Sequence, residues 1–215
     1  LRQLTRQGPD EELDVDETID TTCRNGGEID LVYRPERRNN IRLALFMDVG
    51  GTMEPYTEPV SRLLTALHEE RGLRDFKSFY FHNCIYERVG TTADLYTQGA
   101  IPTADVLRRL DERWKVLIVG DAAMHPAELL NPRGNINPRH TADTRGVDWL
   151  LRIREHFERC VWLNPDPPKD WDLTRTTRII RGLFPMFPLS LDGIQEAVTS
   201  LIGARPSAPP GAVRH

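Results

Sequence analysis

The sequence predicts an α/β domain with a doubly wound, mostly parallel sheet, helices on both faces and one antiparallel edge strand. Short apolar runs of strand length alternate with longer segments of helical periodicity, which is typical of a parallel sheet. Two of the apolar runs end on an aspartate, Asp48 and Asp121. The chain has 215 residues, of which 39% are hydrophobic, so it can form one such domain with a sizeable core.

The predicted elements follow in the order β-α-β-β-α-β-α-β-α-β-α, which right-handed crossovers assemble into one sheet. Strands are predicted over residues 43–47, 77–82, 85–89, 116–119, 160–163 and 186–189, and helices over residues 59–71, 102–112, 147–157, 174–183 and 191–202. The second and third strands are separated by Asn83-Cys84. This dipeptide predicts a hairpin, although it is a weaker turn than Asn-Gly, and the hairpin would supply the antiparallel edge strand.

The segments that flank this domain differ from it in composition. Residues 1–40 form an N-terminal extension that is first acidic and then basic, with seven carboxylates in residues 10–20. Low apolar content and high charge predict that this extension is partly extended or disordered. Residues 204–215 are rich in Pro, Ala and Gly and predict a disordered tail. The α/β domain is therefore assigned to residues 41–203.

Charge and hydropathy argue against nucleic-acid and membrane partners. The formal net charge is −4, so no global positive field attracts anions. No apolar run approaches the roughly 20 residues that span a bilayer, and the N-terminus lacks the apolar core of a signal peptide. Cys23, Cys84 and Cys160 lack metal-ligand spacing, which favours reduced thiols. We therefore expect a cytoplasmic protein.

The most informative segment is residues 42–53, where an apolar run ends on Asp48 and Gly-Gly-Thr follows after one residue. Ligands bind at the carboxyl ends of strands in open parallel sheets. Because a buried strand delivers Asp48 and Thr52 to one place, their hard oxygen donors suit a Mg²⁺-like cation or a phosphate.

Two enzyme classes have turns that resemble this segment. In sugar-kinase and actin-like ATPases, an Asp-x-Gly-Gly-Thr turn approaches nucleotide phosphates, but it joins two strands, and residues 54–71 contain no predicted strand. This phosphotransferase remains the alternative function. Phosphatases of the haloacid-dehalogenase type need a second Asp two residues after the first, and this position is Gly50.

A third resemblance covers more of the chain. Asp48-x-Gly50-x-Thr52, Thr103 within Ile-Pro-Thr-Ala-Asp-Val-Leu, and Asp121 after Val-Leu-Ile-Val-Gly resemble, in order and spacing, the metal-ion-dependent adhesion site of von Willebrand factor A (VWA) domains. The segments Asp-Val-Gly-Gly-Thr-Met, Phe-Tyr-Phe-His-Asn-Cys-Ile-Tyr-Glu, Val-Gly-Asp-Ala-Ala-Met and Val-Trp-Leu-Asn-Pro are similar to the CoxE-like branch of these proteins. The resemblance extends over about residues 13–201.

This resemblance implies a metal-dependent binding module rather than an enzyme. By analogy with the family, Thr52 and Thr103 would bind Mg²⁺ (or Mn²⁺) directly, and Asp48 and Asp121 would act mostly through water. Gly50 lacks the hydroxyl that the family has there, so a water would take its place and the affinity for Mg²⁺ would be lower. An Asp or Glu of a protein partner would fill the open coordination position. The oxygens of the four side chains should then converge at one point.

The family resemblance also implies a partner. CoxE-like proteins typically accompany a MoxR-type AAA+ ATPase in the maturation or remodelling of a target enzyme, so we expect this ATPase or its client to be the partner. Structural roles remain open for several residues. Asp48 and Asp121 could cap the segments that follow them, and Thr103 could simply begin a helix. His82 and Asn83 could shape the hairpin turn, or Asn83 could order the rim of the site.

Overall fold

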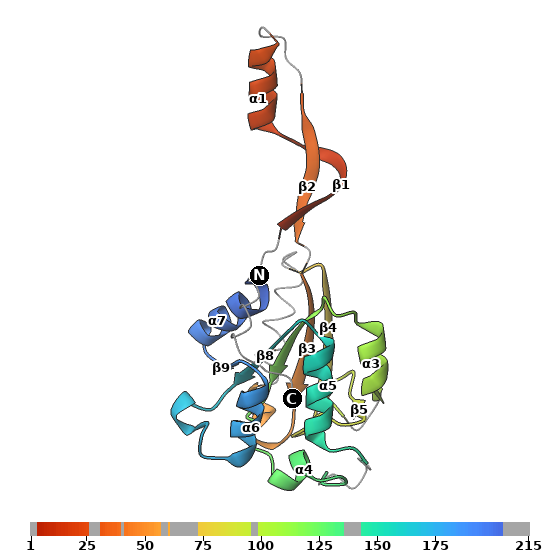
Figure 1. Ribbon diagram of the computed structural model, residues 1–215, viewed down its shortest axis with the longest axis vertical. Helices are drawn as coiled ribbons and strands as arrows, with labels where there is room; N and C mark the ends of the chain where they lie inside the picture. Colours follow the sequence, from red (N-terminus) through yellow and green to blue (C-terminus); the bar gives the residue numbers. More distant parts are fainter. Residues whose placement is uncertain are drawn as a thin grey trace, which may run out of the picture. The chain divides into compact units, whose positions relative to one another are not determined.

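The computed structural model describes residues 4–25, 31–39, 41–56, 60, 73–95, 99–135 and 143–203. The chain divides into two compact units (Figure 1). The first comprises Leu1–Arg42 and Ser61–Phe76, and the second comprises Leu43–Val60 and Lys77–His215.

The first unit contains an antiparallel strand pair and a helix. Strands β1 (Leu4–Leu13) and β2 (Tyr33–Asn39) pair with each other, and α1 (Val15–Arg24) lies between them in sequence. The sequence predicts an extended or disordered acidic segment over residues 10–20; residues 10–13 are extended in β1, whereas residues 15–20 are helical. Acidic side chains favour this helix because Asp14 accepts a hydrogen bond from the Glu17 N–H at 3.2 Å and carboxylates complement the N-terminal end of the helix dipole.

The second unit is built on a mainly parallel sheet of five strands in the order β4-β3-β7-β8-β9. The strands are β3 (Arg42–Asp48), β4 (Asp75–Phe81), β7 (Lys115–Val119), β8 (Arg159–Asn164) and β9 (Met186–Pro188). β7 pairs in parallel with β3 and β8, and β9 pairs in parallel with β8. In this register Met47 lies opposite Val119, so β3 and β7 end side by side.

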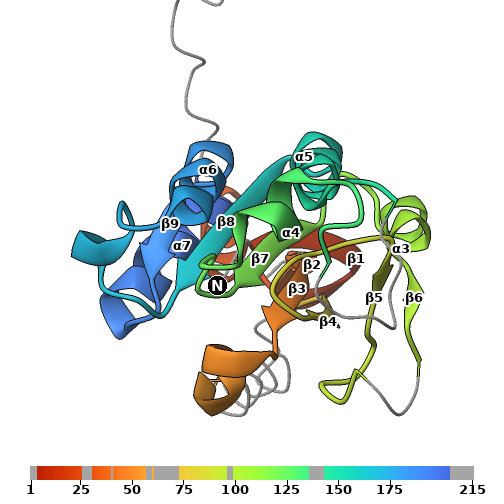
Figure 2. The same cartoon turned by 90° about the horizontal axis from the view of Figure 1, so that it is seen from below.

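Helices connect the strands and cover both faces of the sheet. They are α3 (Thr103–Arg109), α4 (Pro126–Leu130), α5 (Gly146–His156), α6 (Arg175–Leu183) and α7 (Leu191–Ile202), with short 3₁₀ turns at Gly51–Met53 and Pro168–Asp170. α5 and α6 lie along one face (Figure 2), and α7 packs against β8 and β9. Every residue of β3 after Arg42 is buried, as expected for a central strand covered on both sides. The predicted fold class is confirmed.

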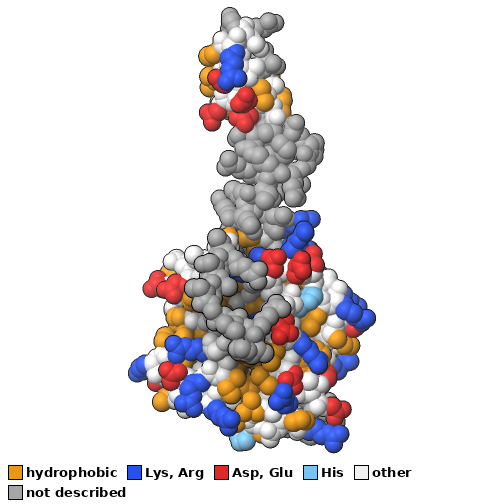
Figure 3. Space-filling model, viewed as in Figure 1, with side chains coloured by type: hydrophobic (Ala, Val, Ile, Leu, Met, Phe, Trp, Pro, Cys, Tyr) orange, Lys and Arg blue, Asp and Glu red, His pale blue; other side chains and the backbone are white. Residues whose placement is uncertain are grey.

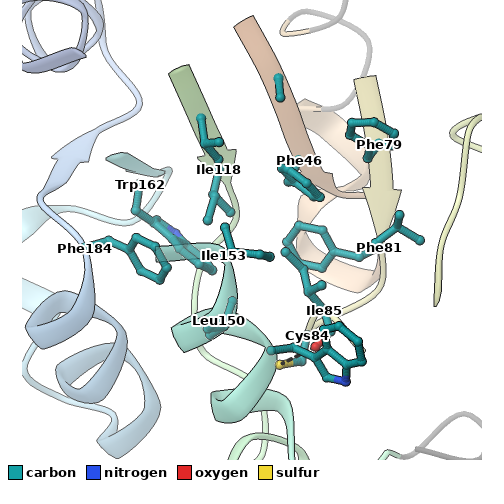
Figure 4. Packing of buried hydrophobic residues seen from close by; sticks show 14 of the residues in the cluster. Phe46, Phe79, Phe81, Cys84, Ile85, Ile118, Leu150, Ile153, Trp162 and Phe184 are labelled. Atoms are coloured by element: carbon teal, nitrogen blue, oxygen red, sulfur yellow. Dashed lines mark hydrogen bonds between the residues drawn. The ribbon is translucent and has the colours of Figure 1, made fainter. Parts of the chain in front are cut away.

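Alternate residues of the central strands form the larger hydrophobic core. Phe46, Ile118 and Trp162 of β3, β7 and β8 point toward Leu150 and Ile153 of α5 (Figure 4). All five side chains are at most 1% exposed. This packing holds the sheet rigid beneath the loops at its carboxyl edge.

The predicted hairpin is shorter than the sequence suggests. Of residues 85–89, only β5 (Arg88–Val89) is a strand, and it pairs with β6 (Ile101–Pro102) in a separate two-stranded sheet. Among the described residues, the pairing of this segment with β4 consists of an isolated antiparallel bridge between Tyr80 and Gly90, and a second bridge joins His82 and Cys84 across the turn. Predicted helix 102–112 ends at Arg109. Of predicted helix 59–71 only Val60 is described, and residues 204–215 lie outside the described residues.

The surface carries charges of both signs. On the face seen in Figure 3, Lys and Arg side chains are interspersed with Asp and Glu side chains. None of the described helices is long and apolar enough to cross a lipid bilayer.

Candidate metal centre

Asp48 ends β3 and is 2% exposed. Its Oδ1 accepts hydrogen bonds from the backbone N–H groups of Gly50, at 3.0 Å, and Asn83, at 3.1 Å. No described residue donates a hydrogen bond to the other oxygen, Oδ2. One half of this buried carboxylate is therefore satisfied by the protein, and the other half is open.

The electrostatic environment of Asp48 contains negative charge without a balancing cation. Burial raises the pKa of Asp48 to about 7, while the two backbone N–H groups oppose this shift and the carboxylates of Asp121 and Glu128 add to it. Among the described residues, no Lys or Arg forms an ion pair with Asp48. A buried carboxylate with acidic neighbours and an open oxygen provides a favourable position for a divalent cation.

Asp121 and Thr52 are joined directly, although they are 69 residues apart. The Thr52 hydroxyl donates a hydrogen bond to Asp121 Oδ2, and Asp121 Oδ1 accepts one from the Ala123 N–H at 2.9 Å. Asn164 at the end of β8 donates to the Asp121 carbonyl at 2.8 Å, which fixes the backbone of Asp121. The carboxyl ends of three strands thus cooperate in positioning one acidic side chain.

Gly120 links Asp121 to Asp48. A Cβ atom placed on Gly120 would lie 3.2 Å from Asp48 Cβ and 3.6 Å from Asp48 Oδ2. The open oxygen of Asp48 therefore faces the end of β7, directly before Asp121. Together with the Thr52 hydrogen bond, this places Asp48, Thr52 and Asp121 around one corner of the sheet.

Gly50 and Gly51 follow Asp48, and each position favours glycine for a different physical cause. Gly51 has a φ of +50°, a left-handed conformation that favours Gly. Gly50 is extended, with a φ of −96°, so its backbone accepts other residues. A side chain at position 50 would collide with His82, because its Cβ would lie 2.2 Å from His82 Cδ2. The imidazole occupies the place that a side chain at position 50 would need.

Thr103 is positioned differently from the other predicted ligands. It begins α3 and is fully buried, its hydroxyl donates to the Tyr86 carbonyl, and its N–H donates to the Glu87 carbonyl at 2.8 Å. Within the described part of the chain, no hydrogen bond connects Thr103 with Asp48 or Asp121. A hydroxyl that donates its proton keeps lone pairs for a metal, so ligation by Thr103 stays a prediction.

Glu128 in α4 is a second buried carboxylate, which the sequence interpretation missed. It is 1% exposed, and its two oxygens accept hydrogen bonds from the Asn83 amide at 3.2 Å. Oε2 also accepts the His125 N–H at 3.1 Å. The pattern His-Pro-Ala-Glu indicates a capped helix start, which is the only sequence signal for this role. Asn83 therefore connects Asp48 with Glu128 and orders the rim of the site.

The donor set fits a hard divalent cation that retains several waters. Asp48, Thr52 and Asp121 offer carboxylate and hydroxyl oxygens, which suit Mg²⁺ or Mn²⁺. In the described ranges, no group of three or more His, Cys, Asp and Glu side chains is gathered as a ready metal cage. Hydroxyl groups and waters would therefore complete the coordination, and a position would remain for an external ligand.

Comparison with known proteins identifies the family of the chain. The chain matches the sequence model of the family described as VWA domain containing CoxE-like protein over residues 1–125, which is more than half of its length. The match includes β3, which ends on Asp48, and β7, which Asp121 follows after one intervening residue. No curated protein matches the chain. The protein therefore belongs to the family of CoxE-like proteins that contain a VWA domain.

Proposed function

We propose that the domain is a metal-dependent protein–protein interaction module. VWA domains typically serve as interaction modules, and the finer proposal is that this one binds a partner carboxylate through Mg²⁺ or Mn²⁺. Asp48, Thr52 and Asp121 would hold the ion, with Thr103 as a further predicted ligand. The observation that carries the proposal is the open Oδ2 of buried Asp48 beside the Thr52–Asp121 pair.

Charge explains why the metal would control binding. Without a cation, the carboxylate of a partner would approach Asp48 and Asp121 at close range, and like charges repel. A divalent ion reverses this interaction and offers a coordination position to an incoming Asp or Glu. Association should therefore require the ion.

We propose that the domain has no catalytic activity of its own. The phosphotransferase alternative needs a strand after the Gly-Gly-Thr turn to form a phosphate-binding hairpin. Here the turn continues into a 3₁₀ segment, Gly51–Met53, and residues 54–56 are helical. This continuation supports the interaction module. ATP offers a direct test, because it should stabilise a phosphotransferase against thermal unfolding beyond the effect of Mg²⁺ alone, and it should not stabilise an interaction module.

The proposed partner is a MoxR-type AAA+ ATPase or the enzyme on which it acts. This part of the proposal rests on the family resemblance. The domain would link the ATPase to a target enzyme during maturation or remodelling, and the partner would present an exposed Asp or Glu to the metal.

The proposal can be tested with the purified chain and a purified MoxR-type AAA+ ATPase. We expect association to be lost in excess EDTA and to return with Mg²⁺ or Mn²⁺. The double variant Asp48→Ala with Thr52→Ala should fold and bind at least about tenfold more weakly. Asp172→Ala with Thr199→Ala changes an exposed pair of the same types and is the matched control. If this double variant binds the ATPase as tightly as wild type does and EDTA has no effect on binding, the proposal is refuted.

A further inference from the structure

The most distinctive local feature of the site is the contact between Gly50 and His82. A Cβ atom on Gly50 would lie 2.2 Å from His82 Cδ2, 2.5 Å from Nε2 and 2.8 Å from Cγ. No pair of non-bonded atoms comes so close, so the ring edge that contains Nε2 fills the space of a side chain at position 50. In the family pattern, this side chain carries a hydroxyl that binds the metal.

The backbone on both sides of His82 is held in place. Val49 donates its N–H to the Phe81 carbonyl at 3.0 Å, which ties the end of β4 to the end of β3. On the other side, Asn83 donates its N–H to Asp48 Oδ1, and its φ of 58° reverses the chain. The His82 carbonyl accepts the Cys84 N–H at 2.6 Å. The position of His82 next to Asp48 is therefore a consequence of several hydrogen bonds.

The imidazole of His82 has no other partner among the described residues. It is half-buried, and neither ring nitrogen takes part in a hydrogen bond or ion pair in the described structure. The other described histidines are engaged: His125 Nδ1 accepts the Ala127 N–H at 3.2 Å, and His156 Nε2 lies 2.7 Å from the Leu110 carbonyl. A half-buried imidazole that contacts Gly50, two residues after Asp48, and has no partner among the described residues has a free nitrogen to offer to a ligand.

We infer that His82 Nε2 supplies the metal ligand that Gly50 cannot supply. This inference rests on the proposed function and names the donor set of the same site: the His82 nitrogen with oxygens from Asp48, Thr52 and Asp121. Among the described residues, His82, Asp48 and Asp121 are not gathered closely enough to hold an ion as they stand, so the inference requires the imidazole to turn toward the ion when it binds. The glycine and the histidine form a pair, because only Gly at position 50 leaves room for the ring.

An imidazole nitrogen changes which ion the site prefers. Mg²⁺ favours oxygen donors, whereas Mn²⁺ and the later first-row ions accept nitrogen more readily. The site should therefore bind Mn²⁺ or Co²⁺ more tightly than Mg²⁺, by a larger margin than an all-oxygen site of the same charge.

Pulsed electron paramagnetic resonance with Mn²⁺ alone tests the inference. Wild type loaded with Mn²⁺ should show coupling of the ion to a directly bound ¹⁴N nucleus. His82→Ala should lose this coupling and bind Mn²⁺ at least about tenfold more weakly, since even outer-shell changes at metal sites cost about 10- to 100-fold. His125→Asn, which keeps a capping residue at an exposed histidine, is the control and should retain the coupling.

The double variant His82→Ala with Gly50→Ser restores the hydroxyl and removes the ring that blocks it. It should bind Mg²⁺ more tightly than His82→Ala does and should show no ¹⁴N coupling. Thermal melting and circular dichroism establish that each variant is folded. If wild type binds Mn²⁺ without ¹⁴N coupling and His82→Ala binds equally well, the His82 ligand is refuted while the metal site stands. If folded wild type binds no Mn²⁺, both proposals fail.

Discussion

Two buried carboxylates at the same edge of the sheet, Asp48 and Glu128, have opposite hydrogen-bonding states. Both carboxylate oxygens of Glu128 accept hydrogen bonds from the Asn83 amide, and one of them also accepts a hydrogen bond from the His125 N–H. Asp48 receives two N–H groups on Oδ1 and none from the described residues on Oδ2. Asn83 contributes to both, through its side chain to Glu128 and through its backbone to Asp48.

This difference separates a structural acid from a candidate ligand. A buried carboxylate whose oxygens are both satisfied stabilises the loops that it joins. A buried carboxylate with one open oxygen lowers the stability of the metal-free protein unless a cation binds there. Burial alone would not distinguish Asp48 from Glu128, because the two side chains are 2% and 1% exposed.

The largest expected effect is a pH dependence caused by Asp48. Because burial raises its pKa to about 7, the folded metal-free protein keeps a proton that the unfolded chain releases near pH 4. The free energy of unfolding should therefore fall as pH rises from about 4 to about 7, by up to about 4 kcal/mol. Urea titrations in EDTA measure this fall.

Asp48→Asn should remove most of this pH dependence, because an amide does not titrate in this range. Saturating Mg²⁺ should restore stability near pH 7 in wild type and not in the variant. If the stability of the metal-free wild type does not change between pH 4 and pH 7, burial does not destabilise the ionised form of Asp48.

Replacement of Glu128 is expected to lower the free energy of unfolding by an amount similar to the pH effect of Asp48. Glu128→Ala leaves the Asn83 amide and the His125 N–H without their acceptor and opens a cavity, so the free energy of unfolding should fall by about 3 kcal/mol. Denaturant titration measures the change. Glu155→Ala on the exposed side of α5 is the control, with an expected change within about 0.5 kcal/mol. Equal effects of the two substitutions would contradict the structural role of Glu128.

A smaller effect is expected at the residue that links the two acids. Asn83→Ala loses the amide bonds to Glu128 and places an alanine at a φ of 58°, whereas Asn83→Gly loses the same bonds without the backbone strain. Both variants should be less stable than wild type. The free energy of unfolding of the alanine variant should be about 1 kcal/mol lower than that of the glycine variant. Thermal melting compares them directly. If the alanine variant is the more stable of the two, the left-handed turn at Asn83 is not the preferred backbone conformation.

The sequence predicts the central fold well because the core leaves a periodic signal. The predicted helix over 191–202 has the same bounds as α7, and the apolar run 43–47 lies within β3. The hairpin after β4 is less accurate, because the chain reverses at Asn83 and then extends only as far as the short strand β5. Local pattern cannot determine how far a pair of strands continues when tertiary contacts end it.

The candidate site is predictable only in part for the same reason. Strand ends place Asp48 and Asp121 at one edge, so their proximity follows from topology. The burial of Glu128 depends on an amide 45 residues away. The position of His82 over Gly50 depends on the register between β3 and β4. These pairings are tertiary contacts, and one sequence by itself contains no signal for them.

Calorimetric titration of Mg²⁺ and Mn²⁺ into three proteins tests the central claim most directly. Wild type should bind one ion, Asp48→Asn should bind about 10- to 100-fold more weakly, and Glu128→Gln should bind like wild type if it remains folded. Asp48→Asn keeps the size of the side chain and removes only its charge, so weaker binding would identify the open carboxylate as part of the metal site. Equal affinity of wild type and Asp48→Asn, or loss of binding in folded Glu128→Gln alone, would contradict the account.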